Sequence, residues 1–333
     1  VLGTNDADLI CAHLGVTDRG NFEHGQSVLE IVQTSEALAL AFQLPKLEVD
    51  VRLNAAKKKL LEARSKRIAP GTDDKILCGW NGLTIRGLAF ASRAFQAPAW
   101  AHLATQCADV ILTHMLTSDG RLYRCFQNGQ ARLPGLLEDY GHLAAGLVAL
   151  AQATFEERFL TAATSLVDKA FELFFDAERV AFRTTAVNEK TLPVTTWSTH
   201  DNASPSGAST LIEATLALGA LLSRSDYIDR ARAYLSRHAD EAVAHPLAFG
   251  HLLTALDTSL DGALCITVTD NATQASPYIA VVNGNYNPTA CVKRASAIDN
   301  LKSAILCQNF ACTQPFDSAH DFVEALNKAS ERC

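Results

Sequence analysis

The sequence lacks the features that mark nucleic-acid-binding, membrane-spanning and metal-binding proteins. It has no excess of basic residues, because 29 Lys and Arg against 36 Asp and Glu give a formal net charge of −7 and a pI near 5.8. No basic face is therefore available to neutralise nucleic-acid phosphates. The sequence also has no apolar run of membrane-spanning length, no metal-ligand spacing, no Gly-rich phosphate loop and no nucleophile elbow. We expect no nucleic-acid partner, no membrane span, no metal and no cofactor.

The nine cysteines are scattered through helical patterns and lack the regular spacing of a small disulfide-rich secreted domain. Cys307 and Cys312 lie five positions apart and are not a Cys-x-x-Cys pair, so their spacing favours packing over thiol exchange. We therefore expect reduced, buried cysteines and no disulfide. The corresponding location is an intracellular reducing compartment, either the cytosol or an organelle matrix.

What is present is a repeated pattern of Ala- and Leu-rich helices. With 48% hydrophobic residues, the 333-residue chain is long enough to bury a large core. Apolar periodicity predicts helices over residues 1–15, 27–44, 45–67, 82–95, 99–116, 137–154, 157–175, 206–222, 226–242 and 246–259. Asn128-Gly129 predicts a hairpin turn. Helical hairpins separated by loops of varying length favour a closed toroid over a solenoid with a fixed repeat.

The pattern changes near residue 260. Strands are predicted over residues 180–185, 263–269, 278–282, 290–293 and 304–307, and a closing helix over 317–329. The predicted fold is thus mostly α, with residues 1–260 forming a helical-hairpin (α/α) toroid. Residues 261–333 form a small C-terminal α/β region.

Three motifs precede predicted inner helices. The first joins Asp73-Asp74-Lys75-Ile76-Leu77 to Trp80-Asn81-Gly82-Leu83, the second is Leu137-Glu138-Asp139-Tyr140, and the third is Asp201-Asn202-Ala203-Ser204-Pro205-Ser206-Gly207. A Trp beside an Asn at a helix start provides a flat apolar wall and an orienting amide, as in a pocket. The alternative is that Trp80 only covers the helix end.

In this order the motifs resemble the spermatogenesis-associated protein 20 family. The resemblance implies a six-hairpin toroid similar to N-acylglucosamine 2-epimerase, joined in that family to a thioredoxin-like domain. It covers the C-terminal part of the family's pattern, so the toroid here is expected to be incomplete. Asn202, Ala208 and His142 depart from that pattern, which puts catalysis in doubt.

The motifs supply the groups that sugar epimerases and glycosidases need, namely paired proton-transfer groups and aromatic platforms. The predicted catalytic residues are Glu138, Asp139, His142 and His200, and the predicted substrate-binding residues are Asp73, Asp74, Trp80, Asn81, Tyr140, Asp201 and Ser206. Each acid also has a structural explanation, because acids at helix N-termini act as caps and dipole partners. A single His on a helix is likewise often a hydrogen-bonded structural residue.

Two functions remain open. The chain binds or modifies a carbohydrate through an epimerase- or glycosidase-like toroid, or it is a non-catalytic subunit of a larger assembly built on a degenerate enzyme fold. The expected partners are a sugar ligand and a protein, or the chain's own N-terminal segment, that completes the toroid. Residues 27–44 are expected to form the contact edge, because their apolar positions surround the predicted helix.

Overall fold

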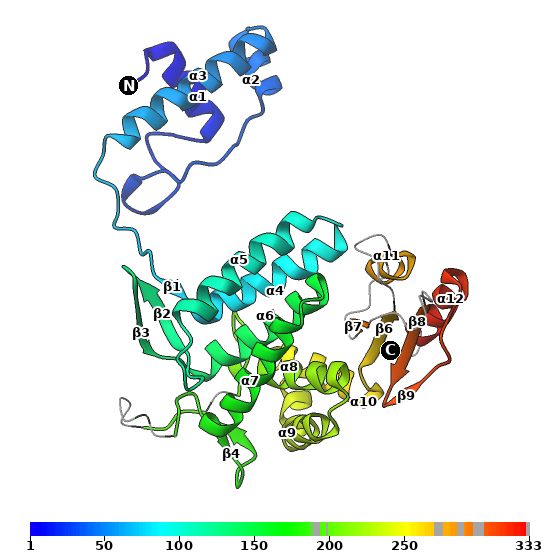
Figure 1. The fold of residues 1–333 in the computed structure, drawn as a ribbon. Coiled ribbons are helices and arrows are strands. Elements are labelled where there is room, and N and C mark those ends of the chain that lie inside the picture. The colour runs from blue at the N-terminus through cyan, green and yellow to red at the C-terminus, as the bar shows by residue number, and fades with distance from the viewer. Residues whose placement is uncertain are drawn as a thin grey trace. The chain divides into compact units, whose positions relative to one another are not determined.

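The computed structural model describes residues 1–187, 189, 194–197, 199–269, 276–284, 290–295 and 303–330. The chain divides into two units, Val1–Asp73 and Asp74–Cys333, each with its own internal contacts (Figure 1). The predicted boundary near residue 260 stays a prediction. In the described part of the chain, no helix has the length and apolar character needed to cross a membrane.

The first unit is a small helical cluster. It comprises α1 Thr4–Leu14, the 3₁₀ turn η1 Glu23–Gly25, α2 Ser35–Phe42 and α3 Lys46–Ser65. The buried core of this unit consists of Leu9, Ile10, Leu38, Val49, Leu53 and Ala56. Arg52 on α3 donates to Asp6 on α1 at 2.8 Å, which ties the two helices together.

The predicted helix over residues 27–44 is wrong, because helix α2 begins only at Ser35. Thr34 caps α2, its hydroxyl accepting a hydrogen bond from the Ala37 amide at 3.3 Å. The preceding stretch is held outside any helix: the Asn21 side chain bonds both backbone groups of Val28, and Val32 donates to the His13 carbonyl. These bonds use the backbone groups that a helix would need.

The second unit is built from helical hairpins. Its elements are β1 Ile76–Leu77, α4 Cys78–Ala94, α5 Pro98–His114, β2 Tyr123–Gln127, β3 Gln130–Pro134, α6 Leu137–Thr154, α7 Glu157–Phe174, β4 Phe175–Asp176, β5 Ala181–Phe182, α8 Gly207–Leu222, α9 Ser225–Ala244, η2 Pro246–Ala248 and α10 Gly250–Asp261. Helices α4, α6 and α8 pack side by side, and α10 packs on α8 and α9 (Figure 1). Helices α5, α7 and α9 pack on the outside of α4, α6 and α8, respectively. This is the inner-and-outer arrangement of an (α/α) toroid, and the predicted mostly α class is confirmed.

Glycines let the inner helices approach closely. A Cβ added to Gly146 of α6 would lie 2.4 Å from the Gly82 carbonyl of α4, and one added to Gly141 would lie 2.4 Å from the Gly207 carbonyl of α8. Contacts this short exclude any side chain at these positions. The backbones of α4, α6 and α8 therefore meet directly, and α6 is buried along nearly its whole length.

The predicted hairpin turn at Asn128-Gly129 is confirmed. Both residues have positive φ, 51° and 73°, as a type I′ turn requires. Strands β2 and β3 pair antiparallel on either side of this turn, and β1 pairs antiparallel with β2.

A small α/β region follows the helical hairpins. Its strands β6 Leu264–Thr269, β7 Cys291–Ala295, β8 Ser303–Gln308 and β9 Ala311–Cys312 form a sheet in the order β7-β6-β8-β9. Strands β6 and β7 run parallel, whereas the other pairs are antiparallel. Helices α11 Pro277–Gly284 and α12 Ala319–Ser330 complete this region.

The predicted strand over residues 278–282 is wrong, because these residues belong to α11. Pro277 opens the helix, and Ala280 donates to the Ser276 carbonyl at 3.1 Å. The β-branched residues suggested a strand, but Tyr278, Ile279 and Val282 are buried at helical spacing.

The expectation of no disulfide is also wrong. Cys307 and Cys312 are joined, because the β8–β9 hairpin places them directly opposite each other with a Cα–Cα distance of 4.0 Å. Six other cysteines are free thiols, four of them buried, and Cys333 lies outside the described residues. The predicted reducing compartment stays a prediction.

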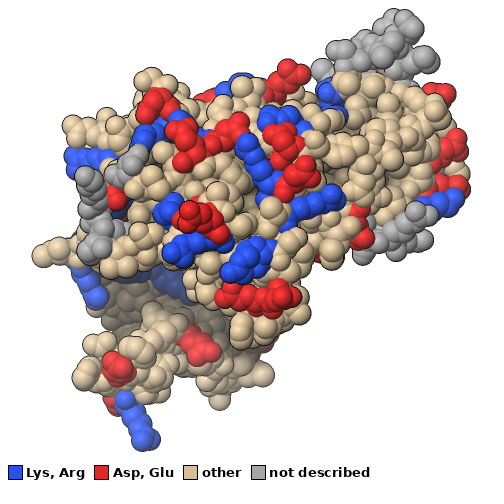
Figure 2. Space-filling model, turned by 90° about the horizontal axis from the view of Figure 1, so that it is seen from below, with Lys and Arg blue, Asp and Glu red and all other residues tan. Residues whose placement is uncertain are grey.

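Charges of both signs are mixed on the surface. Figure 2 shows Lys and Arg side chains interspersed with Asp and Glu on one face of the molecule. No large area of that face carries a single sign of charge.

Candidate functional site

The N-terminal ends of α4 and α6 are joined by Asp139, which is 2% exposed. One carboxylate oxygen accepts from the Gly79 amide at 2.9 Å, and the other accepts from the Leu136 amide at 2.8 Å. Arg124 adds a third donor at 3.3 Å. Burial raises the pKa of Asp139 to about 6, against the lowering effect of the Leu136 and Gly79 amides and of Arg124. The carboxylate therefore fastens two helix starts together.

Glu138, the neighbouring predicted acid, has a more open position. Its carboxylate accepts from Arg124 at 2.7 Å, and its side chain is 39% exposed. Arg124 thus lies between two adjacent acids, one buried and one accessible. Of the two, only Glu138 has a side chain that solvent or a ligand can reach.

The other residues predicted on α6 lie in the core. Tyr140 is 1% exposed, accepts from the Leu122 amide at 2.8 Å and packs edge-on against Phe174. Burial raises the pKa of Tyr140 to about 12. His142 is 1% exposed, its Nε2 lies 3.0 Å from the Pro205 carbonyl, and burial lowers its pKa. A ring nitrogen facing a carbonyl must carry the proton, so Nε2 is the donor.

Asp201 joins the starts of α8 and α10 in the same way. One oxygen accepts from the Ser206 amide and the Ser209 hydroxyl, both at 2.7 Å. The other accepts from the amides of His251 at 2.8 Å and Leu252 at 3.3 Å. Ser206 is the N-cap of α8, its hydroxyl accepting from the Ser209 amide at 3.0 Å. These contacts satisfy helix-end amides that would otherwise lack acceptors.

The remaining predicted residues lie apart from these junctions. Trp80 is 67% exposed, and the Asn81 amide donates to the Leu77 carbonyl and contacts Cys107 of α5. Asp74 is exposed and accepts from Gln127, and Asp73 is exposed at the end of the first unit. His200 is exposed and packs on Phe249, with ring centroids 5.0 Å apart.

Two of the predicted acids, Asp139 and Asp201, thus lie at separate helix junctions, where each binds backbone amides. This is the capping explanation that the sequence left open. The predicted catalytic and binding roles stay predictions.

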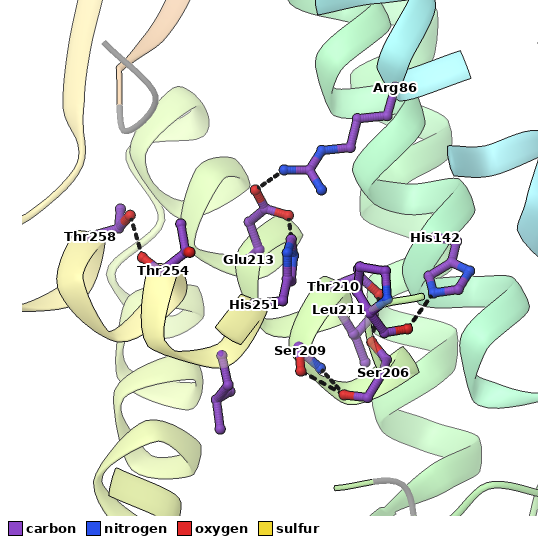
Figure 3. A network of polar contacts seen from close by, with 12 residues as sticks. Arg86, His142, Ser206, Ser209, Thr210, Leu211, Glu213, His251, Thr254 and Thr258 are labelled. Atoms are coloured by element: carbon purple, nitrogen blue, oxygen red, sulfur yellow. Dashed lines mark hydrogen bonds and ion pairs between the residues drawn. The ribbon is translucent and has the colours of Figure 1, made fainter. Parts of the chain in front are cut away.

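A second polar cluster, which the sequence did not predict, joins helices α4, α8 and α10. Glu213 of α8 accepts from Arg86 of α4 at 2.5 Å and lies 2.9 Å from Nε2 of His251 of α10 (Figure 3). The exposed fraction of the side chain is 21% for Arg86, 28% for Glu213 and 14% for His251. They are thus held by one another, yet remain accessible.

The electrostatics of this cluster favour an ionised Glu213. Burial alone would raise the pKa of Glu213, but the His251 hydrogen bond and the Arg86 charge outweigh it, and the net pKa is lowered. The carboxylate therefore stays negative near neutral pH. Its hydrogen bond to Nε2 orients the His251 ring.

Arg86 and Glu213, but not His251, line a cavity of about 60 Å³ between the helices and the C-terminal α/β region. Phe90 of α4 and Thr254 and Thr258 of α10 share its wall. Figure 3 shows Thr254 and Thr258 following His251 along α10. Phe90 is 43% exposed, with the Arg86 guanidinium 5.5 Å from its ring centroid. The cavity wall combines an aromatic ring, a cation, a carboxylate and two hydroxyls.

The sequence contains a pattern that could have predicted this cluster, namely single charged residues within apolar stretches of two helices. Glu213 is the only charged residue in α8, and Arg86 follows Ile85 in an apolar run of α4. Charged residues are rarely buried unless they are paired. The opposite charges of Glu213 and Arg86, on two predicted helices, could have been matched. Among the described residues, no group of three or more His, Cys, Asp or Glu side chains could hold a metal ion.

Comparisons with known proteins place the chain among relatives of low sequence identity. It is 26% identical to human spermatogenesis-associated protein 20, covering 95% of this chain and 46% of the relative. It is 29% identical to the rat protein of the same name, covering 74% of this chain and 34% of the relative. The chain therefore spans less than half the length of these relatives. No family model matches the sequence.

Solved structures resemble the chain more distantly. An α-mannanase of Bacteroides thetaiotaomicron has a TM-score of 0.47 at 15% identity, covering 78% of this chain and 71% of that one. A cellobiose 2-epimerase of Bacillus thermoamylovorans has a TM-score of 0.42 at 14% identity, covering 61% and 57%. Likenesses at this level assign no activity. The sequence matches agree with the resemblance drawn from the three motifs, and the chain is similar to spermatogenesis-associated protein 20 over most of its own length.

Proposed function

We propose that the chain carries an acid–base site of a carbohydrate-modifying domain, with His251 as the group that moves the proton. The observation that carries this proposal is the Arg86–Glu213–His251 network, to which helices α4, α8 and α10 each contribute one side chain. Charged groups on core helices are costly to hold there unless they are paired or serve a function.

The contacts support a separate role for each group. His251 presents Nε2 to Glu213, so the carboxylate fixes the proton on Nε2 and leaves Nδ1 as the basic atom. Nδ1 would abstract a proton from the carbon next to an opened sugar carbonyl. Glu213 stabilises the resulting imidazolium. Arg86 uses one N–H on Glu213 and has further donors for an oxyanion that forms on the substrate.

The wall of the cavity that Arg86 and Glu213 line suits a sugar. Phe90 provides a partly exposed aromatic face, and the hydroxyls of Thr254 and Thr258 accept or donate hydrogen bonds. The cavity, at about 60 Å³, is smaller than ordinary ligand pockets, which measure about 300–1,000 Å³. A sugar would therefore lie across its mouth. The predicted partner, a second chain or an N-terminal segment, would supply the facing wall.

Deuterium exchange tests the proposal. The purified chain is incubated in D₂O with glucose, mannose, cellobiose or N-acetylglucosamine, and deuterium at C2 is followed by proton NMR. We expect exchange with at least one sugar and a loss of about 10²–10⁴-fold in rate for His251→Ala. His245→Ala, which changes an exposed histidine at the end of α9, is the matched control and should keep the wild-type rate. An active His251→Ala variant would contradict the assignment.

The alternative, a non-catalytic subunit, is supported by a different observation. Asp139 and Asp201 use their carboxylates on backbone amides, which is a structural role. If no sugar exchanges its C2 proton and none binds, the network of Arg86, Glu213 and His251 is a structural ion-pair network, and the subunit function is favoured.

A further inference from the structure

Four cysteines form one row across the C-terminal sheet. The strand register pairs Cys291 of β7 with Cys265 of β6, Cys265 with Cys307 of β8, and Cys307 with Cys312 of β9. Residues directly opposite in paired strands point to the same face of a sheet. The free thiols Cys291 and Cys265 therefore share a face with the Cys307–Cys312 disulfide.

This face borders a cavity of about 220 Å³, between the sheet and helices α8, α9 and α10. Both disulfide cysteines line the cavity, together with Cys265, Arg232 and Lys293. Cys312 is exposed and Cys307 half-buried, so the sulfur–sulfur bond is reachable from solvent. The reactive group and an entry path are thus both present.

The cavity is positively charged. Among the described residues that line it there is no Asp or Glu, whereas Arg232 and Lys293 contribute two cations. Their hydrogen bonds go to neutral oxygens: Lys293 donates to the Leu221 carbonyl at 2.6 Å, and Arg232 lies 3.4 Å from the Asn309 side-chain oxygen. A wall with two cations and no acid favours an anionic ligand.

We propose that this cavity is a redox site for a small thiol that carries carboxylates. The carboxylates bind Arg232 and Lys293, and the thiol exchanges with the Cys307–Cys312 disulfide. The idea is independent of the sugar site, because it uses a different cavity and different residues.

The exchange balances without any further reagent. The thiolate of the ligand attacks Sγ of Cys312, a bond forms between these two sulfurs, and the Cys307–Cys312 bond breaks with its electron pair leaving on Cys307. A second ligand thiolate then attacks the ligand sulfur of the mixed disulfide and releases Cys312. In total, two thiols become one small-molecule disulfide, and the protein disulfide becomes two thiols that take up the two protons. The oxidised ligand drives the reverse reaction.

Reduction rates with thiols of different charge test the proposal. The full chain is exposed to glutathione, which is anionic, to β-mercaptoethanol, which is neutral, or to cysteamine, which is cationic, at equal thiolate concentration. Samples are quenched with N-ethylmaleimide, and mass spectrometry of the peptide containing Cys307 and Cys312 gives the rate. We expect glutathione to react about tenfold faster than cysteamine, as two partly exposed ion pairs allow.

Charge reversal supplies the decisive comparison. Lys293→Glu and Arg232→Glu should each remove most of the preference for glutathione, whereas Lys58→Glu, an exposed lysine of the first unit, should leave it unchanged. Lys293→Gln provides a milder variant if Lys293→Glu does not fold. Equal rates for the three thiols, or a preference that survives both reversals, would overturn the proposal.

A trapped intermediate tests the order of attack. In Cys307→Ser, which leaves Cys312 unpaired, oxidised glutathione should add one glutathione to Cys312. Labelling spread equally over the exposed and buried cysteines would contradict a dedicated site, as would no labelling at Cys312.

Discussion

Replacing Asp201 with Asn should destabilise the second unit, because one side chain caps two helices at once. The carboxylate accepts four hydrogen bonds, two on each oxygen, from the starts of α8 and α10. An Asn side chain has one carbonyl oxygen and one NH₂ group. It can therefore serve only one helix start, and its NH₂ group must face amide donors at the other.

The magnitude follows from the groups left without an acceptor. A half-buried amide that loses its acceptor costs about 1–3 kcal/mol. The lost negative charge adds about 0.3–1 kcal/mol at each helix N-terminus. The expected total is about 2–4 kcal/mol, which for a unit of this size lowers Tm by roughly 5–15 °C.

Tryptophan fluorescence measures this change in the intact chain. All three tryptophans, Trp80, Trp100 and Trp197, lie in the Asp74–Cys333 unit. Their fluorescence therefore reports the unfolding of this unit and not of Val1–Asp73. Thermal and urea unfolding should agree on the loss of stability if the unit unfolds in one step.

Asp226→Asn is the matched control, because Asp226 is an exposed acid in the first turn of α9, paired with Arg224 at 2.6 Å. An exposed pair of this kind contributes about 0–1 kcal/mol. If Asp201→Asn lowers the free energy of unfolding no more than Asp226→Asn does, then Asp201 does not cap both helices as its contacts indicate. The predicted substrate-binding role of Asp201 would then be favoured.

Two further predictions concern the start of α6. Tyr140→Phe removes the hydroxyl that accepts a hydrogen bond from the Leu122 amide, which is then buried without an acceptor. The free energy of unfolding, measured in urea, should fall by about 1–3 kcal/mol. A change within about 0.3 kcal/mol would contradict this and would mean that water replaces the hydroxyl. Asp139 should make the unit less stable as pH rises, because its pKa in the folded state, about 6, lies above the unfolded value of about 3.9. The folded state therefore binds the proton more tightly than the unfolded state. The resulting stabilisation is complete below about pH 4 and is lost as pH rises through about 6. The loss is on the order of 3 kcal/mol, and Asp139→Asn should abolish this part of the pH dependence between pH 4 and pH 7; identical pH profiles for the two proteins would refute it.

The sequence predicted the helical hairpins well, because their apolar periodicity is long and their boundaries carry clear signals. Helix α6 begins and ends where the pattern places it, at Leu137 and Thr154. The hairpin at Asn128-Gly129 follows from local turn chemistry alone. The failures lie where distant contacts decide. Residues 28–33 are not helical, because Asn21 and the end of α1 bind their backbone.

The candidate site was harder to predict for the same reason. Asp139 and Asp201 look alike whether they cap helices or bind substrate, and only the positions of amides from other helices separate the two roles. The Arg86–Glu213–His251 network depends on three helices that are far apart in sequence. Spacing within one helix could mark Glu213 as unusual, but it could not identify its partners.

The glycine contacts between inner helices bear on ligand size. Gly82 lies one turn before Arg86 on α4, and Gly207 lies at the start of α8, the helix that carries Glu213; both meet the backbone of α6 directly. Gly82 and Gly207 therefore set the distance between α4 and α8, because each allows its helix to touch the backbone of α6. A relative with Ala at either position would hold these two helices farther apart. The width of the mouth of the cavity that Arg86 and Glu213 line would then depend on these two glycines, although neither lines the cavity. The same glycines would limit the largest sugar ring that fits there.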